Sequence, residues 1–142
     1  MTDAAFALQS AIVTALKTVP DLTAYLGGES AASPSRVYDA VPATARFPYV
    51  SIGPAQVNRQ DATCILGREV FQQVDVWSRE PGFTQAKRIG GLIEDALHNL
   101  EASSGGLRFD IEHRFTSYLR DGDGLTSHGA LSFRAEIYEF NE

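Results

Sequence analysis

The sequence predicts an α+β fold: a mostly antiparallel sheet of about four to five strands, with an N-terminal helix and one long central helix packed on one face. Three observations predict this class. Two segments repeat apolar residues at helical spacing, two later segments alternate apolar with polar residues, and short loops rich in glycine or proline separate them. The length of 142 residues suits one domain, and we expect residues 1–142 to form it.

The first segment, residues 3–19, is expected to be an amphipathic helix. Its apolar residues lie three and four positions apart, so one stripe would contain Ala5, Leu8, Ile12, Ala15, Leu16 and Val19. Pro20 should end this helix, because a proline ring clashes with the preceding helical turn. A short helical turn over residues 22–26, capped by Asp21, is expected to follow.

In the next part of the chain, the sequence predicts a short strand at 37–38 and a longer strand over residues 49–57. Gly53-Pro54 lies inside the longer strand and indicates a bulge or an edge position, because proline cannot donate to a sheet ladder. Polar residues 58–63 predict the tip of a projecting hairpin that leads into a strand over residues 65–78. Both faces of that strand carry apolar and polar side chains, so we expect one face to meet the helices and the other a neighbouring subunit.

The central helix is expected to follow Gly82 and to extend to Leu100, with charged residues around an apolar stripe. Gly90 and Gly91 lie in its middle. Each glycine costs roughly 1 kcal/mol relative to alanine in a helix interior, so the pair indicates close packing of the helix backbone on the sheet or on a partner.

The last third of the chain predicts two strands, each with one buried face. The expected inward residues of the first are Leu107, Phe109, Ile111, His113 and Phe115. The expected inward residues of the second are Leu131, Phe133, Ala135 and Ile137. A loop containing Asp121-Gly122-Asp123-Gly124 joins the two strands.

Charge and residue types exclude several functions. The net charge of −6 argues against a protein that grips nucleic acid, which needs clustered Lys and Arg. The chain has no apolar run long enough to span a membrane and no basic signal-peptide start, so we expect folding in a cytoplasm. A single cysteine, Cys64, allows no disulfide within one chain.

No residue set predicts catalysis, a metal site or a cofactor. His98, His113 and His128 match no metal-ligand spacing, and a core role is expected for His113. The loop at 121–124 begins like a calcium loop, but Leu125 stands where an oxygen ligand is needed. The glycine pairs form no phosphate-binding pattern.

Four segments, taken in order, resemble the tail-completion, or tail-terminator, proteins of long-tailed phages and of phage-like gene-transfer agents. They read LQSAIVTALKTVPDLTAYLG, RVYDAVPATARFPYVSIG, VFQQVDVWSREPGFTQAKRIGGLIEDALHNL and LSFRAEIYEF. The resemblance spans nearly the whole chain and rests on short apolar patterns rather than on reactive motifs.

This resemblance implies a structural virion protein, not an enzyme. It also implies a homohexameric ring that caps the head-proximal end of the tail tube, ends tube polymerisation and joins the tail to the head-side connector. The implied partners are further copies of the chain, the tail tube protein and the head-side stopper or connector protein, with DNA passing through the ring without specific binding. The implied location is the tail neck of a particle assembled in the bacterial cytoplasm, with no membrane and no cofactor.

The expected contact regions are the hairpin, the two-sided strand and the loop before the last strand. The candidate subunit or tube interface residues are Gln56, Asn58, Arg59, Gln60, Asp61, Arg68, Gln73, Asp75, Trp77, Asp121, Asp123 and His128. Charge reversal at Arg59 or Asp61 is expected to perturb assembly more than stability.

Two alternatives stay open on the sequence. The chain could be another neck component, such as a head-tail stopper or adaptor. It could also be a small-molecule-binding or enzymatic α+β domain with a pocket at His113 and the Trp77 face.

Overall fold

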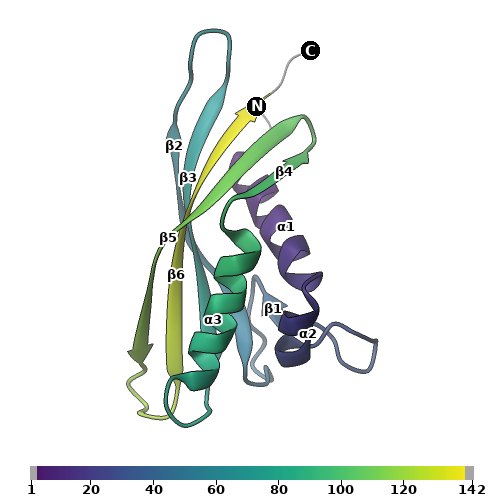
Figure 1. Ribbon diagram of the computed structural model, residues 1–142, viewed down its shortest axis with the longest axis vertical. Coiled ribbons are helices and arrows are strands. Elements are labelled where there is room, and N and C mark those ends of the chain that lie inside the picture. The colour runs from purple at the N-terminus through teal and green to yellow at the C-terminus, as the bar shows by residue number, and fades with distance from the viewer. Residues whose placement is uncertain (1–2, 140–142) are drawn as a thin grey trace.

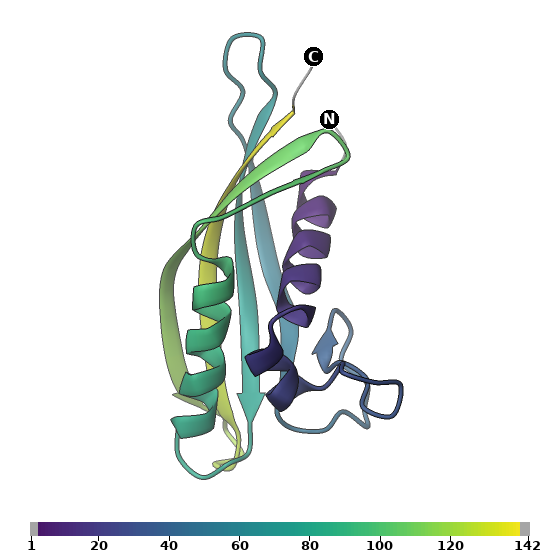
Figure 2. The same ribbon diagram turned by 45° about the vertical axis from the view of Figure 1, so that its right-hand side comes forward.

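The computed structural model describes residues 3–139 and shows three helices against one face of a six-stranded sheet (Figures 1 and 2). The helices are α1 (Ala4–Lys17), α2 (Pro20–Leu26) and α3 (Thr84–Leu97). The strands are β1 (Val37–Tyr38), β2 (Tyr49–Arg59), β3 (Gly67–Ser78), β4 (Leu100–Ser104), β5 (Leu107–Arg120) and β6 (Ser127–Glu139).

The strand order is β1-β2-β3-β6-β5-β4. β1 runs parallel to β2, and every other pair of neighbours is antiparallel. The α+β class and the mostly antiparallel sheet are therefore confirmed, but the expected four to five strands are wrong, because the described residues form a mixed sheet of six. The missed strand is β4, a short and mostly exposed segment that pairs with the first half of β5.

The N-terminal helices follow the sequence pattern with one correction. The Asp3 carboxylate accepts hydrogen bonds from the backbone N–H groups of Ala5 and Phe6 at 3.1 and 3.2 Å, which caps α1. Helix α2 begins at Pro20 instead of after an Asp21 cap. Proline suits the first helical position because its missing N–H has no partner there in any helix.

Helix α3 ends at Leu97, three residues earlier than expected. Asn99 adopts a left-handed conformation with φ of 60°, which asparagine tolerates better than most residues, and the chain then enters β4. Leu100 is therefore a strand residue opposite Ile111.

The hydrophobic core lies between the helices and the inner face of the sheet. Leu8, Ile12 and Leu16 of α1 pack there with Ile89 and Ile93 of α3. The sheet contributes Val50, Val70, Val74, Val76, Leu107, Phe109, Ile111, Leu131, Phe133, Ala135 and Ile137. The inward residues predicted for β6 are all buried, as are the first three predicted for β5.

The alternation of β5 reverses at a bulge, which corrects the prediction for Phe115. The pairing with β6 shifts register between His113 and Phe115, so Phe115 points away from the helices and is 53% exposed. One extra residue at a bulge moves all later side chains to the opposite face. Thr116 and Tyr118 take the inward positions instead.

The bulge predicted in β2 is confirmed, since the register with β3 shifts between Ile52 and Ala55. The buried side chain of Gln72 completes it by donating to the backbone carbonyls of Gly53 at 3.0 Å and Gln73 at 2.8 Å. A polar residue can therefore occupy an inward position, because the bulge frees carbonyls that need donors.

The hairpin of β2 and β3 projects beyond the helices (Figures 1 and 2), and we call residues 56–68 the arm. Strand β2 runs two residues further than predicted, and mutual backbone hydrogen bonds between Ala62 and Ile65 close the tip. Cys64 lies in that tip with φ of 64° and is exposed.

Candidate assembly interface

The arm is held together by the Asp61 carboxylate. It accepts hydrogen bonds from the Gly67 backbone N–H at 3.0 Å, from Arg68 at 2.9 Å and from Arg59 at 3.0 Å. The Gly67 N–H lowers the pKa of Asp61 below its usual value, and the hydrogen bond and charge of Arg59 add to the effect. Asp61 and Arg68 therefore have a role inside the arm, which the sequence did not reveal.

Other arm residues face solvent. The Arg59 side chain is 72% exposed although it touches Asp61, and Val57, Ile65 and Leu66 are exposed apolar residues. Gln56 and Asn58 form a local hydrogen bond at 3.2 Å, and Gln60 is exposed. Exposed apolar side chains on a projecting hairpin are typical of a segment that binds another protein.

The face of the sheet away from the helices carries a row of aromatic rings across three strands. The Trp77 ring of β3 stacks on the His128 ring of β6, with ring centres 4.0 Å apart and planes 7° apart. Tyr49 of β2 lies 6.3 Å from Trp77 on the other side, and Phe47 lies 5.0 Å from Tyr49. Phe47 and Tyr49 belong to the same surface, and the signal for them was the Phe-Pro-Tyr sequence at the start of the strand.

Polar bonds fix this aromatic row in place. His128 Nε2 lies 2.6 Å from Asp75 Oδ1, which also accepts from the Gln73 amide at 2.8 Å. The Trp77 indole N–H donates to the Ser51 hydroxyl at 3.0 Å. Asp75 is only 6% exposed, so its role is to position His128, whereas Trp77 and His128 keep part of their surface exposed.

The loop between β5 and β6 is organised by Asp123. Its carboxylate accepts from the backbone N–H groups of Leu125 and Thr126 and from the Thr126 hydroxyl at 2.7 Å. These bonds, the Thr126 hydroxyl first, lower the pKa of Asp123. Asp121 closes the same turn through its backbone N–H, so the loop is a structured turn that leaves Leu125 70% exposed.

The predicted interface residues thus fall into two groups at opposite ends of the sheet. Gln73, Asp75, Trp77 and His128 come together on the face without helices, with Asp121 and Asp123 beyond the end of that row. The arm residues Gln56, Asn58, Arg59, Gln60, Asp61 and Arg68 lie at the other end (Figure 1).

Arg134 is a further charged centre on this face that the sequence did not single out. Its guanidinium contacts Glu69 at 2.6 Å, Glu136 at 2.7 Å and Glu112 at 3.3 Å, so one cation holds carboxylates from three strands. The hydrogen bonds from Glu136 and Glu69 raise the pKa of Arg134 above its already high value.

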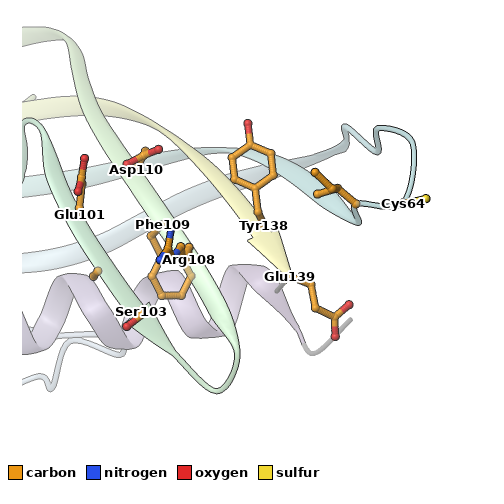
Figure 3. A pocket seen from close by; sticks show the side chains of 10 residues that line it. Cys64, Glu101, Ser103, Arg108, Phe109, Asp110, Tyr138 and Glu139 are labelled. Carbon is orange, nitrogen blue, oxygen red and sulfur yellow. The ribbon is translucent and has the colours of Figure 1, made fainter. Parts of the chain in front are cut away.

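An open hollow of about 720 Å³ lies beside the arm (Figure 3). Side chains of β4, β5, the end of β6 and the arm tip line it. Apolar groups of Ile65, Ala102 and Tyr138 lie there together with the carboxylates of Glu101, Asp110 and Glu139 and the guanidinium of Arg108.

The pocket postulated from His113 and the Trp77 face does not form, because these residues lie on opposite faces of the sheet. His113 faces α3, where its ring contacts Glu94 at 3.2 Å and Thr116 at 2.7 Å and packs edge-on against Phe133. It is the satisfied core histidine that the sequence led us to expect. Within residues 3–139, no group of His, Cys, Asp and Glu could hold a metal ion.

Residues 10–138 match the family described as tail completion protein gp17. This chain belongs to that family. The match covers both groups of predicted interface residues, and the predicted resemblance to tail-completion proteins is confirmed.

A solved structure agrees with this family assignment. The chain resembles one in the virion of a native gene transfer agent particle, with 27% identity and a TM-score of 0.82, over 97% of this chain and 99% of that chain. No curated protein matches the sequence. Family and structural likeness together identify a structural tail protein of the gp17 type, and the predicted place in a phage-like particle is confirmed.

The features described above for this gp17-family chain are surfaces and a hollow open to solvent. The described helices include none long and apolar enough to cross a membrane. The arm, the aromatic row and the hollow are the features that contact with other chains would use.

Proposed function

We propose that the chain is a tail terminator. Six copies would form a ring on the head-proximal end of the tail tube, stop addition of tube subunits and present a surface to the head-side stopper or connector. DNA would pass through the ring without specific binding. Membership of the tail completion family supports a role at the end of the tail.

The observation that carries this proposal is the sheet face without helices. On that face Trp77 and His128 are half-buried while Phe115 and Leu119 are 53% and 52% exposed, an arrangement that a monomeric protein seldom leaves in water. The described strands also leave two edges open, along β2 beyond β1 and along β5 beyond β4. Closed rings are a common way to cover such surfaces, because each subunit meets one neighbour on each side.

Tube assembly in the presence and absence of this chain tests the proposal. We expect purified tail tube protein alone to polymerise to variable lengths, and addition of the chain to stop growth and to place a ring on one tube end. Negative-stain electron microscopy measures both tube length and ring size. Tubes that grow equally long with the chain present, and carry no ring, would overturn the proposal.

The same material separates the tail terminator from a head-side stopper or adaptor. A terminator is captured by immobilised tube protein, whereas a stopper is captured by the portal-side protein and leaves tube length unchanged. Capture by tube protein together with shortened tubes supports the terminator.

A further inference from the structure

We propose that the open edge of β5 pairs with the open edge of the arm in a second copy of this chain, so that main-chain hydrogen bonds join the sheets of neighbouring subunits. The paired segments are residues 116–120 of β5 and residues 55–59 of β2. This inference rests on the proposed function and deepens it, because it names the surfaces through which subunits of the ring contact each other.

Strand β5 has an open edge along its second half (Figure 1). β4 pairs with residues 107–111 only, so no described strand lies beside the later part of β5 on that side. The Asp121 N–H donates to the Thr126 carbonyl, toward β6, at 2.8 Å. Because successive residues of a strand direct their N–H groups to opposite sides, this bond shows which N–H groups point away from β6. They are those of Thr116, Tyr118 and Arg120.

The arm presents a matching edge. β1 pairs only with Val50 and Ser51 of β2, so the later part of β2 has no described neighbour on that side. The Gln60 N–H donates to the Gly67 carbonyl, toward β3, at 3.0 Å. By the same alternation, the N–H groups that point away from β3 are those of Ala55, Val57 and Arg59.

Neither segment carries the features that usually protect an open edge. Edge strands are commonly blocked by proline, by a bulge or by charged side chains. Both bulges and Pro54 come before these segments in their strands. Each segment has one charged residue, and it is the last one, Arg59 or Arg120. Two edges of this kind are templates for pairing with another chain.

An antiparallel register uses the outward donors of both edges. It pairs Ala55 with Arg120, Val57 with Tyr118 and Arg59 with Thr116. Each of these pairs exchanges two N–H···O bonds, and no like charges lie opposite each other. Within one molecule the two edges cannot meet, because β3 and β6 lie between them. The occupant of each edge is therefore a second copy, and a contact between two different edges of the same chain can repeat around a ring.

The stagger of this pairing suits a closed ring. Within one sheet Val57 lies level with Ala135 of β6 and Tyr118 with Gly129, so the two levels are 6 residues apart. At roughly 3.3 Å per residue this is about 20 Å along the strands, while the four strands from β2 to β5 span about 19 Å at roughly 4.8 Å each. Neighbours in a ring are displaced only around its axis, so the strands would tilt by about 45°. Closed sheets tilt their strands by roughly 35–45°.

Residue-resolved amide exchange distinguishes edge pairing from any other contact. In rings on tube ends, the outward amides of Thr116, Tyr118 and Arg120 should exchange about tenfold or more slowly than in the free chain, because each becomes hydrogen-bonded to the neighbour. The amides of Ser117 and Leu119 already face β6 and should be slow in both states. Exchange in the ring, followed by quenching, dissociation and NMR of the released chain, measures this alternation.

A pair of cysteines tests the register. Asn58 and Ser117 of neighbouring subunits would face each other as a non-hydrogen-bonded pair, with Cα atoms about 4.5 Å apart, which suits a disulfide. In a Cys64→Ser background, the double variant Asn58→Cys/Ser117→Cys should therefore link the subunits of a ring into covalent chains under mild oxidation. Gel electrophoresis without reductant measures the links. Asn58→Cys alone and Ser117→Cys alone are the matched controls and should leave the ring unlinked.

Three outcomes count against the inference. Rings in which outward and inward amides of β5 show no difference in slowing overturn the pairing and leave the proposed function intact, and this measurement needs no variant. Rings of the double cysteine variant that stay unlinked overturn the register and the pairing with it. Absence of rings from the unaltered chain with tube protein overturns the proposed function and this pairing together.

Discussion

Tyr118 accounts for one of the two glycines in the middle of α3. Its ring lies between Gly90 of α3 and Gly129 of β6, so a side chain on either glycine would enter the space of the ring. Gly91 differs, because no atom lies within 4 Å of the position that its Cβ would take. The sequence predicted close packing of the pair on the sheet or on a partner. Packing within the subunit is confirmed for Gly90, and contact of Gly91 with a partner stays a prediction.

Alanine at these two glycines should have opposite effects on stability. Gly91→Ala should raise the free energy of unfolding by about 0.5–1 kcal/mol, because alanine favours the helix and meets nothing. Gly90→Ala should lower it by about 1–3 kcal/mol, because Tyr118 is confined by Gly129 and must shift. Urea unfolding of the two variants measures both values, and equal stabilisation by the two would contradict this account.

Arg59→Glu should impair tube capping while leaving monomer stability within about 0.5 kcal/mol, because its side chain is 72% exposed. Asp61→Lys is the informative comparison. Asp61 accepts three hydrogen bonds in the arm, so reversal of its charge should also disorder the arm. The sequence suggested that Arg59 and Asp61 are equivalent, whereas the structure distinguishes them. Measurements of tube length and of thermal melting separate an effect on assembly from an effect on stability. Normal capping by Arg59→Glu would show that Arg59 of the arm does not take part in the interface.

At the scale of elements, the two bulges decide which side chains reach which face. The bulge in β2 was predictable because Gly53-Pro54 stands inside the strand. The bulge in β5 was not, since the residues from His113 to Phe115 include neither glycine nor proline. At this bulge His113 contacts Glu94 of α3 and Thr116, and no local sequence pattern reveals these contacts.

The Gln72 side chain joins β3 to β2 at the β2 bulge. Gln72→Leu should lower the free energy of unfolding by about 1–3 kcal/mol, because the Gly53 and Gln73 carbonyls lose a buried donor. Amide exchange in β2 beyond the bulge should also become faster. Gln56→Leu, at an exposed position of the same strand, is the matched control and should change stability by less than about 0.5 kcal/mol.

The β5–β6 turn should contribute a pH dependence. Its bonds lower the pKa of Asp123 in the folded state, so the associated stability is present above the unfolded pKa of about 3.9 and is lost as pH falls through the folded value. Asp123→Asn should therefore show a smaller loss of melting temperature as the pH falls from about 5 to about 2.5, a range that brackets ordinary carboxyl pKa values. If Asp123→Asn lost as much melting temperature at low pH as the unaltered chain, Asp123 would not be the source of this pH dependence.

The sequence indicated much of the order of elements, because apolar spacing reflects which face is buried. It missed β4, whose five residues are mostly exposed and whose alternation of apolar with polar residues extends over only Leu100 to Ser103. The interface itself stays a prediction: the sequence pointed to the arm and the Trp77 strand, but it could not separate side chains that face solvent from those bonded within the subunit. Asp61, Asp75 and Arg59 are all charged residues in predicted strands or loops, so the sequence treats them alike. Only the structure shows that Asp61 and Asp75 are hydrogen-bonded within the subunit.

At the scale of the molecule, helices cover one face of the sheet and leave the other to charges and rings. The buried core lies between the helices and the sheet, whereas the uncovered face holds ion pairs and stacked rings at the surface of the subunit. Arg134 is an example on the uncovered face, since it balances three carboxylates from three strands.

The stacked Trp77 also gives the molecule an optical probe. It is the only tryptophan of the chain, and it lies half-buried on the uncovered face with His128 against its ring. Emission excited at the indole band therefore reports from that face alone. A neighbour that covers the ring would exclude water and move the emission to shorter wavelength, so assembly could be followed in solution without attaching a dye.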